Sequence, residues 1–184
     1  MPSLTVADGA TLERILDDTY PLWGEGLSRS AYGQWNAAQM RTPWGRHRLR
    51  RYALVESGQV LASAKRYDLV VQLDGQRVPT LGVGAVFTPS EHRGRGYATQ
   101  MIESLCDTAR ADGAQLAMLF SEIGPEYYQR LGFVPVPMTI SDVQVHIKTG
   151  GPPAVLVNGE VVLDARGLTT ARPGRALRRG VPTN

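Results

Sequence analysis

A strand, a helix and a second strand follow one another between residues 81 and 120, and this order constrains the fold more than any other feature. Leu81–Thr88 has the pattern of a strand, and Leu116–Phe120 is a short continuous apolar run, as in central strands. Two strands joined by a helical crossover are parallel in one sheet. Between them, apolar residues recur at the spacing of one buried helix face, at Ala98, Met101, Ile102, Leu105 and Ala109.

The segments before this unit indicate an antiparallel meander. Strand patterns cover Tyr52–Glu56, Val60–Tyr67 and Leu69–Leu73, and Ser57-Gly58 and Asp74-Gly75 supply turn residues. We therefore expect an α+β fold whose central sheet is mixed but mostly antiparallel, with one parallel βαβ unit.

Helices are expected to flank this sheet, and the first two precede it. Ser28 or Ser30 is the expected cap of the second helix. The four expected helices are Ala7–Asp18, Ser28–Met40, Gly96–Arg110 and Pro125–Arg130. The remaining expected elements are strands at Phe133–Val136 and Val143–Ile147 and a hairpin at Val155–Leu163 around Asn158-Gly159.

Length and charge bound the organisation of the chain. Its 184 residues, 42% of them hydrophobic, suffice for one cored domain, which we place at residues 1–149, with a hairpin and basic tail at 150–184. The tail holds five arginines and no acid after Asp164, which is typical of a solvated terminus. Nucleic acid is the weaker alternative, because neither the tail nor the basic run Arg46–Arg51 interleaves aromatic residues.

Several protein classes are disfavoured. No segment approaches the roughly 20 apolar residues of a membrane span, and the N-terminus lacks the pattern of a signal peptide, so a cytoplasmic location is expected. The single Cys106 is expected to pack within a helix, and no spacing of His, Cys and acidic residues indicates a metal site.

The candidate chemistry is concentrated where the strand 81–88 gives way to a helix. Gly94 and Gly96 let backbone N–H groups approach an anion, and the first helical turn adds its partial positive charge. Arg93 and Arg95 can add hydrogen bonds to phosphate. The loop has neither the third glycine of the dinucleotide fingerprint nor a Gly-Lys-Ser/Thr ending. Residues 93–98 therefore predict a pyrophosphate site, with a structural helix cap as the alternative.

Two motifs resemble those of one superfamily. Arg93-x-x-Gly96-x-Ala98 resembles the acyl-CoA signature of the GNAT N-acetyltransferases, and residues 121–133 resemble their second motif. In that motif a tyrosine four residues before a glycine stands near the thioester sulfur, and Tyr128 matches it. The resemblance covers residues 81–137 and implies the GNAT fold, acetyl-CoA as co-substrate and transfer of an acetyl group to an amine.

The resemblance also implies roles for particular residues. Tyr128 would protonate the departing thiolate, although a tyrosine that merely packs is the alternative. The bulged fourth strand would pair with pantetheine and supply an oxyanion donor. The implied cofactor-binding residues are Val86, Phe87, Thr88, Arg93, Gly94, Arg95, Gly96, Tyr97 and Ala98.

The general base stays ambiguous. Glu122 is the leading catalytic candidate because it follows the parallel strand at the end where open sheets hold ligands, but a solvated carboxylate is the alternative. Glu56 is a second candidate beside a turn. His92 precedes the loop and is expected to face solvent or help bind phosphate.

The acceptor is expected beside the first two helices. Aromatic residues there, including Trp23, Trp35 and Trp44, either line a pocket or pack beneath it. Their contexts resemble fungal lysine N6-acetyltransferases, and Ser121-Glu122 is also similar to the enhanced-intracellular-survival family, which acetylates lysines and aminoglycosides. A lysine-like or other small amine is implied, and a catalytically idle acyl-CoA-binding or regulatory module is the alternative. An edge strand at Val143–Ile147 could pair in a homodimer.

Overall fold

The first part of the chain forms a five-stranded mixed sheet. A computed structural model divides the chain into two units, residues 1–135 and 136–184. It describes residues 1–24, 26–73, 75–121 and 123–135, and the backbone of three strands in the second unit. The sheet order is β1-β2-β3-β4-β5, and only β4 and β5 run parallel, which confirms the predicted fold class. The strands are Ser3–Val6, Leu49–Glu56, Gln59–Leu73, Gln76–Phe87 and Leu116–Leu119.

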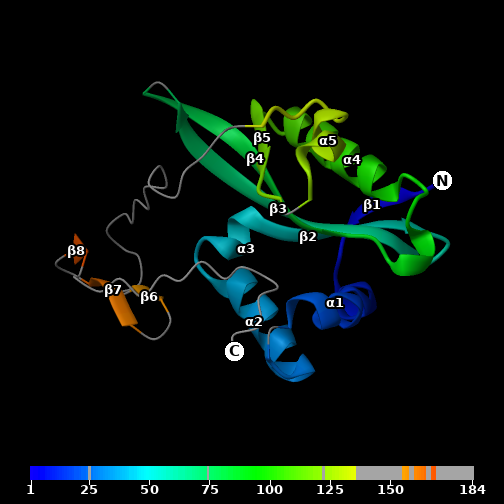
Figure 1. Cartoon of the computed structure of the whole chain (residues 1–184), viewed down its shortest axis with the longest axis horizontal. Helices are drawn as coiled ribbons and strands as arrows, with labels where there is room; N and C mark the ends of the chain where they lie inside the picture. The colour runs from blue at the N-terminus through cyan, green and yellow to red at the C-terminus, as the bar shows by residue number, and fades with distance from the viewer. Residues whose placement is uncertain are drawn as a thin grey trace, which may run out of the picture. The chain divides into compact units, whose positions relative to one another are not determined.

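Helices cover both faces of this sheet (Figure 1). One face, here called the α2 face, carries α1 (Gly9–Trp23), α2 (Arg29–Arg41) and the single turn α3 (Gly45–Arg48). The other, the α4 face, carries α4 (Tyr97–Ala111) and α5 (Pro125–Gln129). The Ser28 hydroxyl accepts a hydrogen bond from the Ala31 N–H at 3.1 Å, so the predicted cap of α2 is confirmed.

The larger hydrophobic core lies under α4. The helix face predicted from the apolar spacing is the face that packs on the sheet. The α2 face has a smaller apolar cluster around Ile15 and Ala53, and it also buries polar side chains of β2 and β3. The core under α4 consists of Leu54, Ala62, Ala64, Leu81, Val83, Met101, Leu105 and Ala109.

Three elements differ from the sequence prediction because their local signals are weak. The strand β1 precedes α1, which itself runs five residues beyond the predicted end at Asp18. As a short edge strand, β1 half-buries only Leu4 and shows little apolar pattern. The predicted separate strand Leu69–Leu73 continues β3, since Asp68 pairs with Leu81 of β4 and does not interrupt the ladder. The short helix α3 was not predicted.

Two further boundaries also differ. The strand β4 begins at Gln76 instead of Leu81, since Pro79 lies just before the pairing with β5 starts at Thr80, where a missing N–H is tolerated. No strand forms at residues 133–135, the described part of the predicted Phe133–Val136. The predicted edge strand Val143–Ile147 lies outside the described residues.

The second unit contains a small antiparallel sheet of β6 (Val155–Val157), β7 (Glu160–Asp164) and β8 (Gly167–Leu168). The pairing of β6 with β7 confirms the predicted hairpin. The domain boundary at residues 149 and 150 stays a prediction, as do the homodimer and the cytoplasmic location. Among the described helices, none has both the length and the apolar character needed to cross a membrane.

Candidate functional site

A β-bulge interrupts β4 where β5 ends. The register between β3 and β4 shifts at Ala64, which faces two residues of β4, Ala85 and Val86. Ala85 has a φ of +48°, in the left-handed region that residues other than glycine rarely adopt. The parallel pairing ends at Val83 and Leu119, so the bulged part of β4 continues without a strand beside it. Its backbone groups on that side are therefore available to a ligand that pairs like an added strand.

The bulge also changes which side chains face each side of the sheet. Before it, Leu81 and Val83 belong to the core under α4, and after it Val86 packs against the same core. Phe87 turns to the α2 face, where its ring lies 6.3 Å from the Trp23 ring in an edge-on arrangement. Phe87 thus brings the bulged strand into contact with Trp23 of α1, on the face where the acceptor is predicted to bind.

Residues 93–98, the predicted phosphate loop, form the end of the connection from β4 and the first residues of α4, and they leave open space in front of them. Gly94 and Gly96 have φ values of +73° and +79°, and Gly96 is the N-cap residue of α4. A Cβ built on either glycine would meet no atom within 4 Å. The first N–H groups of α4 have no intrahelical acceptor and direct the positive end of the helix dipole outward. This geometry suits a phosphate group.

Side chains around the loop support the same assignment. Arg93 Nε donates a hydrogen bond to the Thr88 carbonyl at 3.1 Å and so closes the loop on the end of β4. Arg95 is exposed, whereas Tyr97 and Ala98 are half-buried in the first turn of α4. Thr88 Oγ1 and His92 Nδ1 are buried without hydrogen-bond partners among the described residues. The loop therefore has unused polar atoms as well as open space, and it fits the pyrophosphate of acetyl-CoA.

Tyr128 lies in α5, which is attached to the start of α4. The Tyr127 hydroxyl and Thr99 Oγ1 are 3.2 Å apart and share a hydrogen bond, and Thr99 belongs to the first turn of α4. Tyr128 is 8% exposed, and its ring packs edge-on against the rings of Tyr127 and Phe133. The Tyr128 carbonyl accepts hydrogen bonds from the N–H groups of Leu131 and Phe133. The structure thus attaches the segment of the predicted acid to the helix that follows the predicted phosphate loop.

The structure describes two of the three residues considered for the base. Glu122 lies outside the described residues. Glu56 ends β2 and forms an ion pair with the amino group of Met1 at 2.9 Å, with its side chain 40% exposed. His92 follows β4 within a short 3₁₀ turn and contacts Tyr97 edge-on, beside the phosphate loop. The described residues contain no group of acidic, His and Cys side chains that could hold a metal ion.

Comparison with known proteins identifies the family. Residues 16–136, more than half of the chain, match the family model of the acetyltransferase (GNAT) domain. The chain belongs to this family. The matched residues include the bulged strand, the phosphate loop and Tyr128, so the resemblance predicted from the two motifs is confirmed at the level of the family.

The most similar curated and solved proteins include acetyltransferases. The chain is 29% identical to a lysine acetyltransferase of Yarrowia lipolytica over 138 residues, which are 61% of this chain and 35% of that protein. It therefore spans about a third of that relative's length. A transcriptional regulator from Bacillus halodurans superposes with a TM-score of 0.63 at 15% identity, over 80% of this chain and all of its own. An aminoglycoside antibiotic 6'-N-acetyltransferase from Acinetobacter haemolyticus superposes with a TM-score of 0.59 at 16% identity, over 80% of this chain and 99% of its own.

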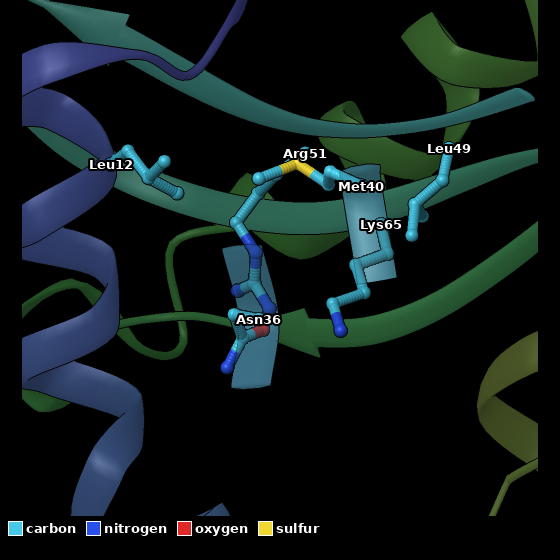
Figure 2. A pocket seen from close by; sticks show the side chains of 6 residues that line it. All are labelled: Leu12, Asn36, Met40, Leu49, Arg51 and Lys65. Carbon is cyan, nitrogen blue, oxygen red and sulfur yellow. The ribbon is translucent and has the colours of Figure 1, made fainter. Parts of the chain in front are cut away.

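On the α2 face of this GNAT domain, two buried cations are direct neighbours across β2 and β3 (Figure 2). Arg51 and Lys65 pair in the register and are 3% and 8% exposed. Lys65 Nζ donates a hydrogen bond to Gln39 Oε1 at 3.0 Å and lies 5.3 Å from the centre of the Trp35 ring. Sequence reasoning placed Arg51 in a basic run and did not single out Lys65. Alternation alone does not reveal the pair, because the register of β2 and β3 shifts between Leu54 and Val55.

Burial changes the acidity of this cation pair. It lowers the pKa of the Arg51 guanidinium, and together with the repulsion from Arg51 it lowers the pKa of Lys65 from 10.5 to about 8. Burial also raises the pKa of the nearby Tyr67 phenol. A charged Lys65 is therefore held in this position at a cost to stability, because a buried ammonium loses its hydration.

Replacing Lys65 with Met is expected to stabilise the protein at neutral pH by about 1 to 3 kcal/mol. Below pH 8 the wild type bears the full cost of burying the ammonium. Between pH 8 and 10.5 the folded wild type has released the proton while its unfolded chain still binds it, so wild-type stability rises and the advantage of the variant shrinks. Urea unfolding of both proteins at several pH values measures this difference. Equal or lower stability of the variant at pH 7 would show that the contacts of Lys65 with Gln39 and Trp35 stabilise the fold by more than burial of the ammonium costs.

Proposed function

We propose that this protein is an acetyl-CoA-dependent N-acetyltransferase that transfers the acetyl group directly to a primary amine, of lysine or of another small molecule. The observation that carries the proposal is the bulge at Ala85 and Val86, where β4 leaves β5 directly before the phosphate loop. Membership of the GNAT family supports it, because this family consists of acetyltransferases. The lysine acetyltransferase of Yarrowia lipolytica supports lysine as one acceptor to test.

In the proposed reaction, the neutral amine attacks the thioester carbonyl carbon and the bond between that carbon and sulfur breaks. Residues 93–98 hold the pyrophosphate, while Val86, Phe87 and Thr88 present backbone groups to the pantetheine and a donor to the developing oxyanion. The Tyr128 hydroxyl gives its proton to the departing thiolate. Glu122 is the proposed base that takes the proton from the amine.

The second candidate is a catalytically idle acyl-CoA-binding or regulatory module. The transcriptional regulator from Bacillus halodurans supports this candidate, because that protein has the same fold as this chain. Both candidates use the phosphate loop, but only the enzyme needs the Tyr128 hydroxyl. Turnover therefore separates them, whereas acetyl-CoA binding does not.

The deciding measurement is the release of CoA thiol from acetyl-CoA in the presence of free lysine, lysine peptides, polyamines and aminoglycosides. We expect turnover with at least one of these amines and none without an amine. Acetyl-CoA binding in calorimetry without turnover would favour the idle module. Absence of binding as well would contradict both candidates.

A further inference from the structure

In the described part of the chain, the Arg51–Lys65 pair has no acidic partner. Among the described residues, no acidic side chain forms an ion pair with either of them. Arg66, the next residue of β3, is similarly buried but faces α4, and it pairs with Asp68 and Asp112 at 2.8 and 2.7 Å. Burial alone would lower the pKa of Arg66, yet the hydrogen bonds to these two carboxylates raise it overall. One buried cation of β3 is thus neutralised within the fold, whereas the described residues leave the pair on the α2 face uncompensated.

Hydrogen-bond donors exceed acceptors around this pair. Arg51 Nη1 and Gln39 Nε2 are buried donors without partners in the described part of the chain. Asn36 Oδ1 and the Ser63 hydroxyl, two residues before Lys65 on β3, are buried acceptors in the same state. Lys65 uses one of its donors on Gln39. Figure 2 shows the head groups of Arg51 and Lys65 projecting to the same side of the sheet, with Asn36 beside the guanidinium. A carboxylate supplies both the missing acceptors and the missing negative charge, since it accepts about four hydrogen bonds.

The pair lies in line with the bulge. Arg51 pairs with Lys65, and Lys65 pairs with Gly84, the residue directly before Ala85. Adjacent strands are about 4.8 Å apart, so the bulged strand runs about 5 Å from the strand of Lys65 and about 10 Å from that of Arg51. Gly84 has no side chain, and a Cβ there would come within 3.0 Å of the Tyr67 ring on the α2 face. The Tyr67 ring, and not a side chain of β4, therefore covers the α2 face at this position.

We infer that Arg51 and Lys65 bind the carboxylate of an acceptor that also carries the reacting primary amine, as an amino acid such as lysine does. This inference rests on the proposed function and names its substrate class. With the carboxylate at the pair, the flexible four-carbon stem of lysine must extend past the Tyr67 ring, which packs on Gly84, to reach the bulge. Polyamines and aminoglycosides would bring further positive charge next to two buried cations, so the same pair rejects them.

The space at the pair limits how the carboxylate enters. The cavity lined by these side chains has a volume of about 10 Å³, close to that of one water molecule. One carboxylate oxygen fits without rearrangement, and the rest of the acceptor must displace its neighbours. Met40 lines the cavity with a flexible side chain, and Trp35 is 51% exposed. Both can move without disturbing the core under α4.

The test compares acceptors that differ only in the carboxylate. Lysine and cadaverine share the amine and the carbon chain, and ornithine and putrescine form a second such pair. We expect kcat/KM of the wild type to be at least about tenfold higher for the acid of at least one pair, as for a hydrogen bond to a charged group. Equal or higher values for both diamines would overturn the inference while leaving the acetyltransferase intact.

Arg51→Met and Lys65→Met are expected to lose this preference, mainly through KM for the amino acid, while kcat/KM for the diamine stays the same or rises. Arg50→Met is the matched control, because it removes the same charge from the adjacent residue, whose guanidinium donates to the carbonyls of Gly45 and Leu49. Arg51→Lys keeps the positive charge, so it serves as a second variant if Arg51→Met fails to fold. If Arg51→Met and Lys65→Met both fold and keep the wild-type preference, the pair does not bind the carboxylate.

Binding measured without turnover separates this inference from the proposed function. Calorimetry with lysine and with cadaverine, in the presence of CoA, should show tighter binding of lysine, lost in Arg51→Met. At a pH just above 8, binding of the lysine carboxylate should cause Lys65 to take up a proton, and Lys65→Met should abolish this uptake. Among the described residues, the titratable groups that face the pair are Tyr32 and Tyr67. Lysine binding without turnover would refute the proposed enzyme and keep the carboxylate site. If no carboxylate ligand binds and Arg51→Met unfolds more easily, an acidic side chain of this chain fills the site and the inference is wrong.

Discussion

Replacing Tyr128 with Phe is expected to lower kcat by about 100- to 10,000-fold, the range for loss of a positioned general acid. The expected change in acetyl-CoA affinity is small, because the ring keeps its packing against Tyr127 and Phe133. Steady-state kinetics with the best acceptor of the panel, together with calorimetry of acetyl-CoA binding, measures both quantities. The pattern of reduced kcat with unchanged binding belongs to a group that acts in the transition state.

The neighbouring tyrosine provides the matched control for this variant. Tyr127→Phe also removes one phenol hydroxyl, but this hydroxyl shares its hydrogen bond with Thr99 and holds α5 against α4. We expect this variant to lose about 1 kcal/mol of stability and less than tenfold in kcat. A wild-type rate in Tyr128→Phe would leave the thiolate proton without a donor in this protein. A large loss in Tyr127→Phe alone would assign the proton to Tyr127.

The predicted phosphate loop and the predicted acid depend on local sequence, which explains why they could be located without a structure. Residues 81–111 contain a strand, two glycines separated by one residue and a helix with one apolar face. This order by itself indicates the path of the backbone. The spacing between Tyr128 and Gly132 is likewise fixed within one short helix and its turn, since Gly132 adopts a φ of +85°. Such features require no knowledge of strand register.

The cation pair depends on register, and the sequence does not reveal it. Counted from the turn at Ser57-Gly58, an unbroken hairpin would place Arg51 opposite Ala64 and Lys65 opposite Arg50. The irregularity at Leu54 and Val55 shifts the pairing by one residue, and Arg51 then lies directly opposite Lys65. A single extra residue in β3 thus decides that Arg51, and not Arg50, lies opposite Lys65. No propensity or spacing rule predicts where that residue is inserted.

A similar register shift between β3 and β4 determines which side chains lie on each face at the end of β4, directly before the phosphate loop. The bulge at Ala85 and Val86 moves Phe87 to the α2 face, whereas an unbroken strand would point it into the core under α4. The loop that follows starts from this altered strand end. The proposed acetyl-CoA site and the proposed carboxylate site therefore meet at one irregular stretch of β4, with Gly84 between them.

Replacing Gly96 with Leu is expected to weaken acetyl-CoA binding by at least about 100-fold, as for the loss of two hydrogen bonds to a charged phosphate group. The Cβ of the new residue would meet no protein atom, so it enters the space in front of the loop instead of displacing the core. There it excludes the pyrophosphate from the first N–H groups of α4. Calorimetric titration with acetyl-CoA and with CoA measures the loss.

The strain of the substitution needs its own control, because Gly96 has a φ of +79°. Gly113 follows the other end of α4 with a φ of +93° and equally open space at its Cβ position. Gly113→Leu therefore carries a similar backbone penalty of about 1 to 2 kcal/mol at a place remote from the phosphate loop. We expect it to lower the melting temperature about as much as Gly96→Leu and to bind acetyl-CoA as the wild type does. Unchanged affinity in Gly96→Leu would refute the assignment of residues 93–98 to the pyrophosphate, and equal losses in both variants would attribute the effect to strain in α4.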